Sequence, residues 1–144
     1  MIILNQGQYQ EIVDYARKFA PIEACGLLGG RINGEERTVE KVYFLTNVDN
    51  SPEHFSLDAK EQFAAVKDMR QNSWVLIGNY HSHPASPARP SAEDKRLAFD
   101  PLASYLILSL LDNVPVLKAF TIVQGTVSEE KIEIMGGGNS DDRG

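Results

Sequence analysis

The segment from Trp74 to Asp94, WVLIGNYHSHPASPARPSAED, constrains the fold more than any other part of the sequence. It begins with apolar, aromatic and β-branched residues, which predict a strand. Three prolines then follow within a short distance, and proline cannot continue a central strand or a helix interior. The run SAEDKRLAF after them is typical of a short helix. We therefore expect a strand that ends at two histidines, turns through a proline-rich loop and enters a helix.

Two longer helices are predicted from the spacing of apolar residues. Over residues 7–20 apolar side chains recur every three or four positions, and Asn5 can cap this helix. A second helix is predicted over residues 58–70, because Asp58 and Glu61 resemble a capping box. The second helix is expected to bury Phe63, Val66 and Met69.

The remaining apolar or alternating runs predict strands, separated by turn signals such as Asn33-Gly34 and Gln124-Gly125. These runs are MIIL at the N-terminus and residues 24–32, 37–45, 104–111, 114–122 and 131–135. The resulting order is strand, helix, two strands, helix, strand, loop, helix and three strands. This order predicts a mixed α/β (α+β) domain, in which helices flank a mixed central sheet.

The length of 144 residues favours a single domain. We expect this domain to span residues 1–135. The final residues 136–144, GGGNSDDRG, contain nothing that could pack in a core. They predict a flexible C-terminal tail.

Charge and composition limit the expected partners and location. The net charge is −6, and a negative protein is repelled by phosphate backbones, so no nucleic acid partner is expected. No apolar run approaches the roughly 20 residues that span a bilayer, and the N-terminus lacks the features of a signal peptide. Cys25 is the only cysteine, so no internal disulfide can form. We therefore expect a cytoplasmic protein without a membrane partner.

The two histidines suggest a metal site. Side chains at positions i and i+2 of an extended segment lie on the same side, so His81 and His83 can direct both imidazoles at one point. Asp94, carried back by the helix, could be a third ligand and leave a fourth position open, as in catalytic zinc sites. Alternatively, Ser91 and Asp94 form a capping box and the histidines are exposed to solvent. The two interpretations are compatible, because a cap at Ser91 would fix the helix that carries Asp94.

Glu23 is a candidate for the proton-transferring group that such a site needs. It stands between Pro21 and the apolar segment ACGLLGG. A carboxylate at the edge of a packed strand is unfavourable unless it is paired or used. Taken alone, however, Glu23 fits an ordinary connector between a helix and a strand, with its carboxylate in solvent.

Read together, PIEACGLLGG and HSHPASPARPSAED resemble the JAMM (MPN+, Mov34/PAD-1) family of zinc-dependent peptidases, and in particular its small prokaryotic branch. The family motif is a glutamate, a distant His-x-His-Pro, a serine separated from the second histidine by seven residues, and an aspartate separated from that serine by two. This chain matches that spacing without a gap, and FSLDAKE before the second predicted helix also looks like the family. The matching positions are Glu23, His81, His83, Ser91 and Asp94.

The resemblance implies an MPN-type, cytidine-deaminase-like domain that binds one zinc ion (Zn2+) per chain. His81, His83 and Asp94 are then the expected zinc ligands. Glu23 is the expected general acid/base, which takes a proton from the attacking water and returns it to the departing nitrogen. Ser91 is expected to stabilise the oxyanion, although a helix cap would compete for the same hydroxyl.

The resemblance also implies a substrate. Members of the small prokaryotic branch are associated with ubiquitin-like sulfur-carrier proteins that end in Gly-Gly. We therefore expect a peptidase or isopeptidase that hydrolyses the amide bond after such a terminus. The alternatives are a non-catalytic MPN module that binds ubiquitin-like tails and a zinc amidohydrolase of a small substrate. The complete set of motif residues argues against the non-catalytic module, because such relatives commonly lack one or more of them.

Five further residues receive structural or solvent-exposed roles. Cys25 has no His or Asn partner near it in sequence and is expected to be a small buried thiol. Trp74 and Tyr80 are expected in the core. His54 and Arg89 are expected in solvent; the alternatives are a place for His54 at the rim of the site and a contact of Arg89 with a substrate carboxylate.

Overall fold

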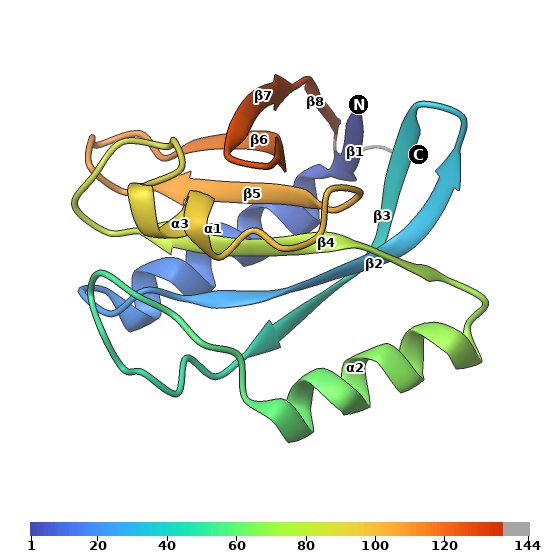
Figure 1. Ribbon diagram of the computed structural model, residues 1–144, viewed down its shortest axis with the longest axis horizontal. Helices are drawn as coiled ribbons and strands as arrows, with labels where there is room; N and C mark the ends of the chain where they lie inside the picture. Colours follow the sequence, from blue (N-terminus) through green and yellow to red (C-terminus); the bar gives the residue numbers. More distant parts are fainter. Residues whose placement is uncertain (137–144) are drawn as a thin grey trace.

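The computed structural model describes residues 1–136 of the 144-residue chain (Figure 1). Apart from Gly136, the expected tail lies outside the described residues, and the domain limit at residue 135 stays a prediction. No helix within residues 1–136 is long and apolar enough to span a membrane. The elements are β1 (Ile2–Asn5), α1 (Gln6–Phe19), β2 (Cys25–Asn33), β3 (Glu36–Leu45), α2 (Ala59–Gln71), β4 (Val75–His83), α3 (Ala92–Arg96), β5 (Ser104–Ser109), β6 (Val116–Val123), β7 (Thr126–Glu130) and β8 (Ile132–Met135).

The strands form one mixed sheet in the order β7-β6-β5-β4-β2-β3-β1-β8. β4 lies near the middle of this sheet, parallel to β5 and antiparallel to β2. β7 and β8 occupy opposite edges, yet only Lys131 separates them in sequence. The sheet must therefore curve until its edges approach each other, as Figure 1 shows for β7 and β8. The Ile2 N–H accordingly donates to the Lys131 carbonyl at 2.9 Å.

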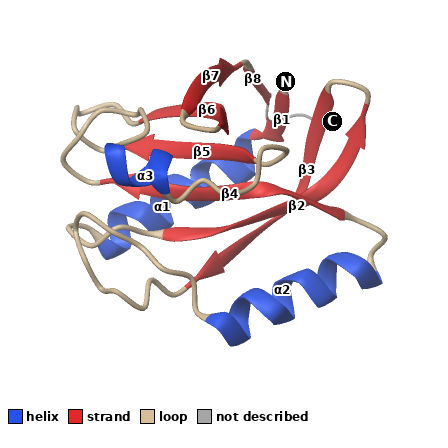
Figure 2. Cartoon of the chain, viewed as in Figure 1, coloured by secondary structure: helices blue, strands red, loops and turns tan. Residues whose placement is uncertain are grey.

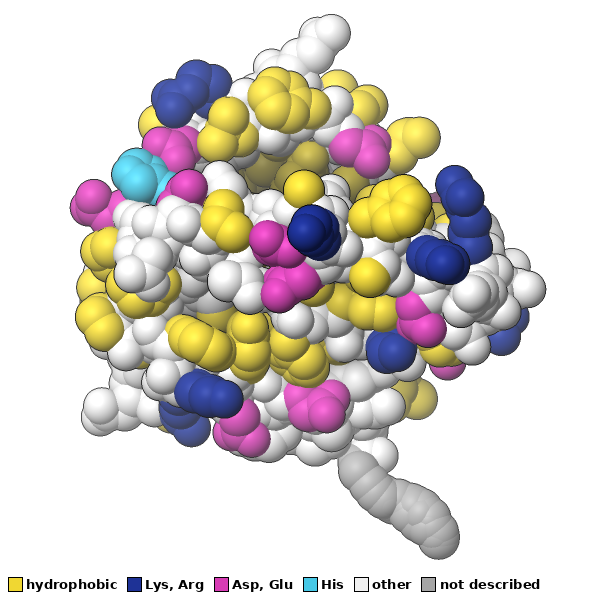
Figure 3. Space-filling view, turned by 90° about the horizontal axis from the view of Figure 1, so that it is seen from below, with side chains coloured by type: hydrophobic (Ala, Val, Ile, Leu, Met, Phe, Trp, Pro, Cys, Tyr) yellow, Lys and Arg dark blue, Asp and Glu magenta, His cyan; other side chains and the backbone are white. Residues whose placement is uncertain are grey.

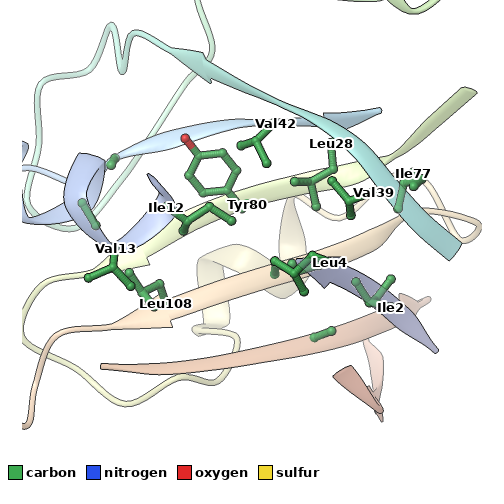
Figure 4. Close-up of a cluster of buried hydrophobic side chains, with 14 residues drawn as sticks. Ile2, Leu4, Ile12, Val13, Leu28, Val39, Val42, Ile77, Tyr80 and Leu108 are labelled. Carbon is green, nitrogen blue, oxygen red and sulfur yellow. The ribbon is translucent and has the colours of Figure 1, made fainter. Parts of the chain in front are cut away.

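Helices cover both faces of the sheet, which confirms the predicted mixed α/β class (Figure 2). Adjacent residues of a strand point to opposite faces, so Leu27 and Leu28 of β2 enter different cores. α1 packs against the larger core, which includes Ile12, Leu28, Tyr80, Leu106 and Leu108 (Figure 4). α2 packs against the smaller core, which includes Leu27, Tyr43, Leu45, Ala65 and Met69.

The two long helices form close to where the apolar spacing predicts them. Asn5 caps α1 in a capping box with Gln8, and Asp58 caps α2 by accepting from the Glu61 N–H. The Glu61 carboxylate does not complete a box; it accepts from the backbone and hydroxyl of Thr46 instead. The expected burial of Phe63 is wrong, since this residue is 75% exposed.

The exposure of Phe63 follows from its position on the helix. α2 buries Ala65 and Met69 and packs Val66 against the same cluster. Successive helical residues rotate by about 100°, so Phe63 points away from Ala65. The apolar character of Phe63 suggested the wrong buried face.

Two local predictions about strands need correction. The β2–β3 hairpin forms, but Asn33 pairs with Glu36, so the two turn residues are Gly34 and Glu35, with Gly34 at φ +64. The predicted order also omits β7. This edge strand, TVSEE, is mostly polar and exposed, so it carries no apolar alternation that sequence could report. The turn before it, at Gln124-Gly125, is confirmed by positive φ at both residues.

Candidate metal centre

The two histidines lie at the C-terminal end of β4, which pairs with a strand on each side. His81 pairs with Cys25 of β2, and His83 pairs with Ser109 of β5. The residues His81 and His83 are only 2% and 4% exposed. The ring of Phe55 stacks on that of His81 with 4.6 Å between centroids. The solvent-exposed alternative for these histidines is therefore wrong.

α3 carries Asp94 back to the histidines. The predicted capping box forms: Ser91 Oγ accepts from the Asp94 N–H at 3.0 Å, and Asp94 Oδ2 accepts from the Ser91 N–H at 2.9 Å. The same Oδ2 lies 3.2 Å from Nε2 of His81 and 3.2 Å from Nε2 of His83. One carboxylate oxygen thus joins the helix cap to the histidine pair, so the cap and the candidate site are a single arrangement.

The three side chains present a compact set of donor atoms. The Nε2 atoms of His81 and His83 are 3.1 Å apart, so with Asp94 Oδ2 they form a nearly equilateral triangle. In a tetrahedral zinc site with bonds of about 2.0–2.1 Å, ligand atoms are separated by about 3.3 Å. The triangle therefore has nearly the dimensions of three corners of such a tetrahedron. The residues fit zinc in both ligand type and spacing, and they could hold a metal ion.

The protonation of His81 and Asp94 suits metal binding. His83 Nδ1 donates to the Pro87 carbonyl at 2.8 Å, which leaves the Nε2 lone pair directed at the centre. Burial lowers the pKa of His81 and favours its neutral form. Burial alone would raise the pKa of Asp94, but hydrogen bonds with His81 and His83 outweigh this effect and leave that pKa below its usual range. Burial alone would lower the pKa of His83, but its hydrogen bonds with Asp94 and the Pro87 carbonyl raise it, so a metal ion must displace a proton from His83 Nε2 when it binds. Neutral imidazole and ionised carboxylate are the forms that bind metal.

Glu23 lies beside this group because the β2–β4 pairing continues past the end of β2. The Ser82 N–H donates to the Ala24 carbonyl at 2.9 Å, and the Ala24 N–H donates to Ser82 Oγ at 2.8 Å. The Glu23 N–H donates to the Ser51 carbonyl at 2.9 Å, and the carboxyl lies close enough to His83 and Asp94 for their charges to affect its pKa. The side-chain amide of Asn47 also donates to the Glu23 carbonyl at 3.0 Å. Contacts distant in sequence therefore decide where Glu23 lies.

The environment of Glu23 contradicts the solvent-exposed connector. The residue is 5% exposed, and its Oε1 has no hydrogen-bond partner among residues 1–136. Burial raises the pKa of the Glu23 carboxyl to about 8. A carboxyl with a pKa near neutrality can both accept and release a proton at the pH of most cells. The arrangement is therefore suited to acid–base chemistry next to the three donors.

The expected competition for the Ser91 hydroxyl does not arise. In the helix cap, Ser91 Oγ is the acceptor of the Asp94 N–H. A hydroxyl has one donor proton besides its acceptor lone pairs. Ser91 can therefore cap α3 and still donate a hydrogen bond to a neighbouring group.

A cavity of about 380 Å³ opens beside the candidate ligands His81 and Asp94. Its lining includes the apolar side chains of Phe55, Leu57, Leu97 and Phe99. In the view of Figure 3, hydrophobic side chains gather around a hollow in the molecular surface. Asn79 lines the cavity from β4, and its buried Oδ1 has no partner within residues 1–136. The cavity is thus suited to an extended, mainly apolar chain that offers an N–H donor.

His54 lies at the rim of the same cavity, as the alternative for this residue proposed. Its Nδ1 is 2.8 Å from Glu93 Oε2, which joins the loop before α2 to α3. The side chain of His54 is 49% exposed, so the expectation that it is solvated holds for only part of the side chain.

Several residues that contribute to the centre have no motif of their own. Ser82, Phe55, Pro87 and Asn79 hold or surround the motif residues, as described above. Asn79 had a usable signal, since its strand position two residues before His81 places both on one face. Phe55 begins the stretch FSLDAKE, which resembles the family, and Pro87 lies four residues after His83. Only Ser82 acts through a contact between segments far apart in sequence, with Ala24.

The other singled-out residues are largely as expected. Cys25 is fully buried, and burial raises the pKa of its thiol to about 12, which leaves it unreactive. Tyr80 belongs to the larger core, and Trp74 packs, partly buried, against the smaller one. Arg89 is exposed.

Comparison with known proteins agrees with this geometry. Residues 5–123 match the family model described as prokaryotic homologs of the JAB domain. The CysO-cysteine peptidase of Mycobacterium tuberculosis is 34% identical over 136 residues, which cover 94% of this chain and 92% of that protein. The desampylase of Haloferax volcanii is 35% identical over 103 residues, which cover 68% of this chain and 73% of that protein.

Solved structures agree as well. The solution structure of a protein from Desulfitobacterium hafniense matches with a TM-score of 0.88 and 59% identity, covering 94% of each chain. The crystal structure of a JAB1/MPN domain protein from Archaeoglobus fulgidus matches with a TM-score of 0.61 over 94% of this chain and 99% of that one. The latter identity is 22%, so this likeness concerns the fold alone.

Proposed function

The chain belongs to the prokaryotic JAB-domain family of JAMM-type hydrolases, and from this premise we propose that it is a zinc-dependent peptidase or isopeptidase acting after the C-terminal Gly-Gly of a ubiquitin-like protein. One observation carries the proposal. Three metal-binding atoms converge within 3.1–3.2 Å of one another. Near them lies the buried Glu23 carboxyl, whose Oε1 has no partner among residues 1–136. This combination supports hydrolysis better than binding alone.

His81, His83 and Asp94 would hold the metal. When bound, zinc would polarise the scissile carbonyl and lower the pKa of a water molecule toward about 7. The hydrogen bond from His83 to the Pro87 carbonyl orients one ligand, and the Phe55 ring shields another, His81, from solvent. The helix cap at Ser91 holds the third ligand, Asp94.

Glu23 and Ser91 would carry out the proton transfer and charge stabilisation. Glu23 accepts a proton from the attacking water and returns it to the leaving nitrogen, which breaks the amide bond without releasing an unstable amide anion. The free O–H of Ser91 donates to the carbonyl oxygen as its negative charge develops. The burial of Glu23 supports this role, because it raises the pKa of the carboxyl and so makes protonation of this group easier.

The substrate is proposed from the cavity and the relatives. The relatives are named for the removal of cysteine from CysO and for desampylation. The apolar cavity beside His81 could take the chain that precedes the scissile bond, with Asn79 Oδ1 accepting one of its N–H groups. Glycine has no side chain, so a Gly-Gly terminus allows the backbone to approach buried ligands closely.

Metal analysis tests the centre first. The purified protein should contain about one zinc per chain, and replacing both His81 and His83 with alanine should remove it. His54→Ala is the matched control, because it deletes a histidine at the rim and should leave the zinc content unchanged. A folded wild type that binds no metal overturns the proposal.

Cleavage tests the reaction. A ubiquitin-like protein extended beyond Gly-Gly is incubated with the enzyme, with and without a chelator, and its mass is measured. We expect loss of the extension only without the chelator, and no loss with Glu23→Gln, which should keep its zinc. Binding of the tail without cleavage would instead indicate the non-catalytic module. Hydrolysis of small amides alone would indicate the amidohydrolase.

A further inference from the structure

A contact between two side chains bounds the apolar cavity next to the metal centre. His54, in the loop between β3 and α2, has its Nδ1 at 2.8 Å from Glu93 Oε2 of α3. Both residues line the same cavity as the candidate ligands His81 and Asp94. The loop and α3 lie at the end of the sheet where β4 ends (Figure 1). The His54–Glu93 pair therefore joins two walls of the cavity that the proposed function assigns to the substrate.

The pair lies at the end of the cavity that adjoins the ligands. Glu93 directly precedes Asp94 in the chain. His54 directly precedes Phe55, whose ring stacks on that of His81. On both walls, then, the pair is one residue away from a group at the centre. The part of a substrate that lies nearest the scissile bond must pass beside it.

The cavity extends from this end along β4. Asn79 lines it two residues before His81, and Tyr105, which pairs with Asn79, lines it from β5. Two residues of a strand span about 6.6 Å, which is also about the reach of two residues of an extended chain. With the scissile carbonyl at the metal, the last two residues before the bond would occupy the section from Asn79 to His81. The very last of them would lie beside the His54–Glu93 pair.

The backbone of His54 is fixed by its own loop. Its N–H donates to Ser51 Oγ at 3.2 Å, and its carbonyl accepts from the side-chain amide of Asn47 at 2.9 Å. Ser51 and Asn47 also bind the backbone of Glu23, through the Ser51 carbonyl and the same amide. His54 can therefore leave Glu93 by rotating its side chain, whereas its backbone is tied to the segment that carries Glu23.

We propose that the His54–Glu93 pair determines specificity, by narrowing the inner end of the cavity so that the last residue before the scissile bond must be glycine. This inference rests on the proposed function. A side chain on that residue would have to separate the pair, which weakens binding of both the substrate and the transition state. Glycine has no Cβ and passes while the pair stays closed. The pair selects the residue on the carrier side of the bond and does not select the group that leaves.

The size of the effect follows from the exposure of the pair. The side chains of His54 and Glu93 are 49% and 31% exposed. A contact exposed to this degree favours its closed form over the open one by up to about fivefold. The penalty that the pair can impose on a substrate side chain is limited by this value. Because the contact adds little to stability, its removal should leave the fold intact.

Two carriers test the inference. A ubiquitin-like protein is extended beyond its C-terminal Gly-Gly, a second version has alanine as the last residue before the extension, and kcat/KM is measured for both. His54→Ala and Glu93→Ala should each cleave the alanine carrier about two- to fivefold faster than the wild type does, without a gain on the glycine carrier. A damaged protein would instead lose activity on both carriers. The double variant should gain no more than either single variant, because each substitution opens the same contact.

Arg96→Ala is the matched control. Arg96 Nη2 lies 3.5 Å from the other oxygen of Glu93, Oε1, but Arg96 does not line the cavity. The control removes an ion pair from the same carboxylate and should keep the preference of the wild type. An equal gain in Arg96→Ala would attribute the effect to loosening of α3 and overturn the inference. An unchanged rate on the alanine carrier in both His54→Ala and Glu93→Ala would also overturn it and leave the proposed hydrolysis intact.

A binding measurement separates the inference from turnover. Two hexapeptide amides, identical except that one ends in Gly-Gly and the other in Gly-Ala, are titrated calorimetrically into Glu23→Gln and into Glu23→Gln/His54→Ala. The second protein should lose about two- to fivefold of the preference for Gly-Gly that the first one shows. If no carrier is cleaved but the peptides follow this pattern, the proposed function fails and the role of the pair stands. If both proteins prefer Gly-Gly equally, the role of the pair fails.

Discussion

Ser82, the residue between the two histidines, should control the position of Glu23 without contacting the substrate. Its Oγ accepts the Ala24 N–H at 2.8 Å, across 58 residues of sequence, and both residues are buried. Ser82→Ala removes this acceptor and leaves a buried N–H without a partner. Such a loss costs about 1–3 kcal/mol. The second link, from the Ser82 N–H to the Ala24 carbonyl, remains in the variant, so the strands should stay paired.

The consequences divide between stability and chemistry. The free energy of unfolding should fall by about 1–3 kcal/mol, which corresponds to about 4 °C in melting temperature for each kcal/mol in a domain of this size. Zinc content should not change, because His81 and His83 keep their pairing with β5. Since Glu23 follows the released backbone, kcat should fall by about 10- to 100-fold while KM changes little.

Urea unfolding, metal analysis and steady-state cleavage measure these three quantities. Ser86→Ala is the control, because Ser86 is exposed and its hydrogen bond within residues 1–136 is formed by its carbonyl, which the substitution keeps. It should match the wild type in all three. If Ser82→Ala were as stable and as active as Ser86→Ala, the Ser82–Ala24 link would not position the carboxyl. If it lost zinc, the effect would lie in the ligands instead.

Substitutions at three further residues test the centre. Burial raises the pKa of Glu23 to about 8. In protein freed of metal by a chelator, the free energy of unfolding of the wild type relative to Glu23→Gln should therefore be constant below about pH 4.5 and fall by a few kcal/mol between pH 4.5 and pH 8. Urea unfolding at several pH values measures this difference, and a difference that does not change with pH would contradict a raised pKa. Ser91→Ala should lower the free energy of unfolding by about 1 kcal/mol and Ser91→Gly by only a few tenths of a kcal/mol. Both variants should lose cleavage activity equally if the hydroxyl donates to the substrate. Full activity in either variant would show that Ser91 only caps α3. Asn79→Ala should raise KM about 3- to 10-fold at constant kcat, and an unchanged KM in cleavage assays would exclude a contact with the tail.

The parts that sequence could predict depend on short spacings. The i, i+2 relation of a strand aligns His81 with His83, and the i, i+3 relation of a helix start joins Ser91 to Asp94. The caps at Asn5 and Asp58 follow the same logic. In each case the interacting groups lie within one turn of a helix or two residues of a strand, so the local backbone conformation sets the distance between them.

Burial was harder to predict because it depends on distant segments. From its own surroundings in sequence Glu23 resembled an exposed connector, yet it is buried, and hydrogen bonds from Ala24 to Ser82 and from Asn47 to the Glu23 carbonyl hold its segment in the fold. Phe63 shows the opposite error, since an apolar residue on a helix stayed exposed when Ala65 and Met69 supplied the buried face. β7 escaped prediction because its polar residues form a strand only by pairing with β6.

The sequence by itself therefore determined the candidate ligand set His81, His83 and Asp94 and the strand–loop–helix unit that carries it. Only the tertiary structure decided that Glu23 is buried near His83 and Asp94 and that an apolar cavity opens beside His81 and Asp94. The physical reason is that sheet register and helix packing set distances between residues far apart in the chain. Local propensity carries no information about those distances until the whole core forms.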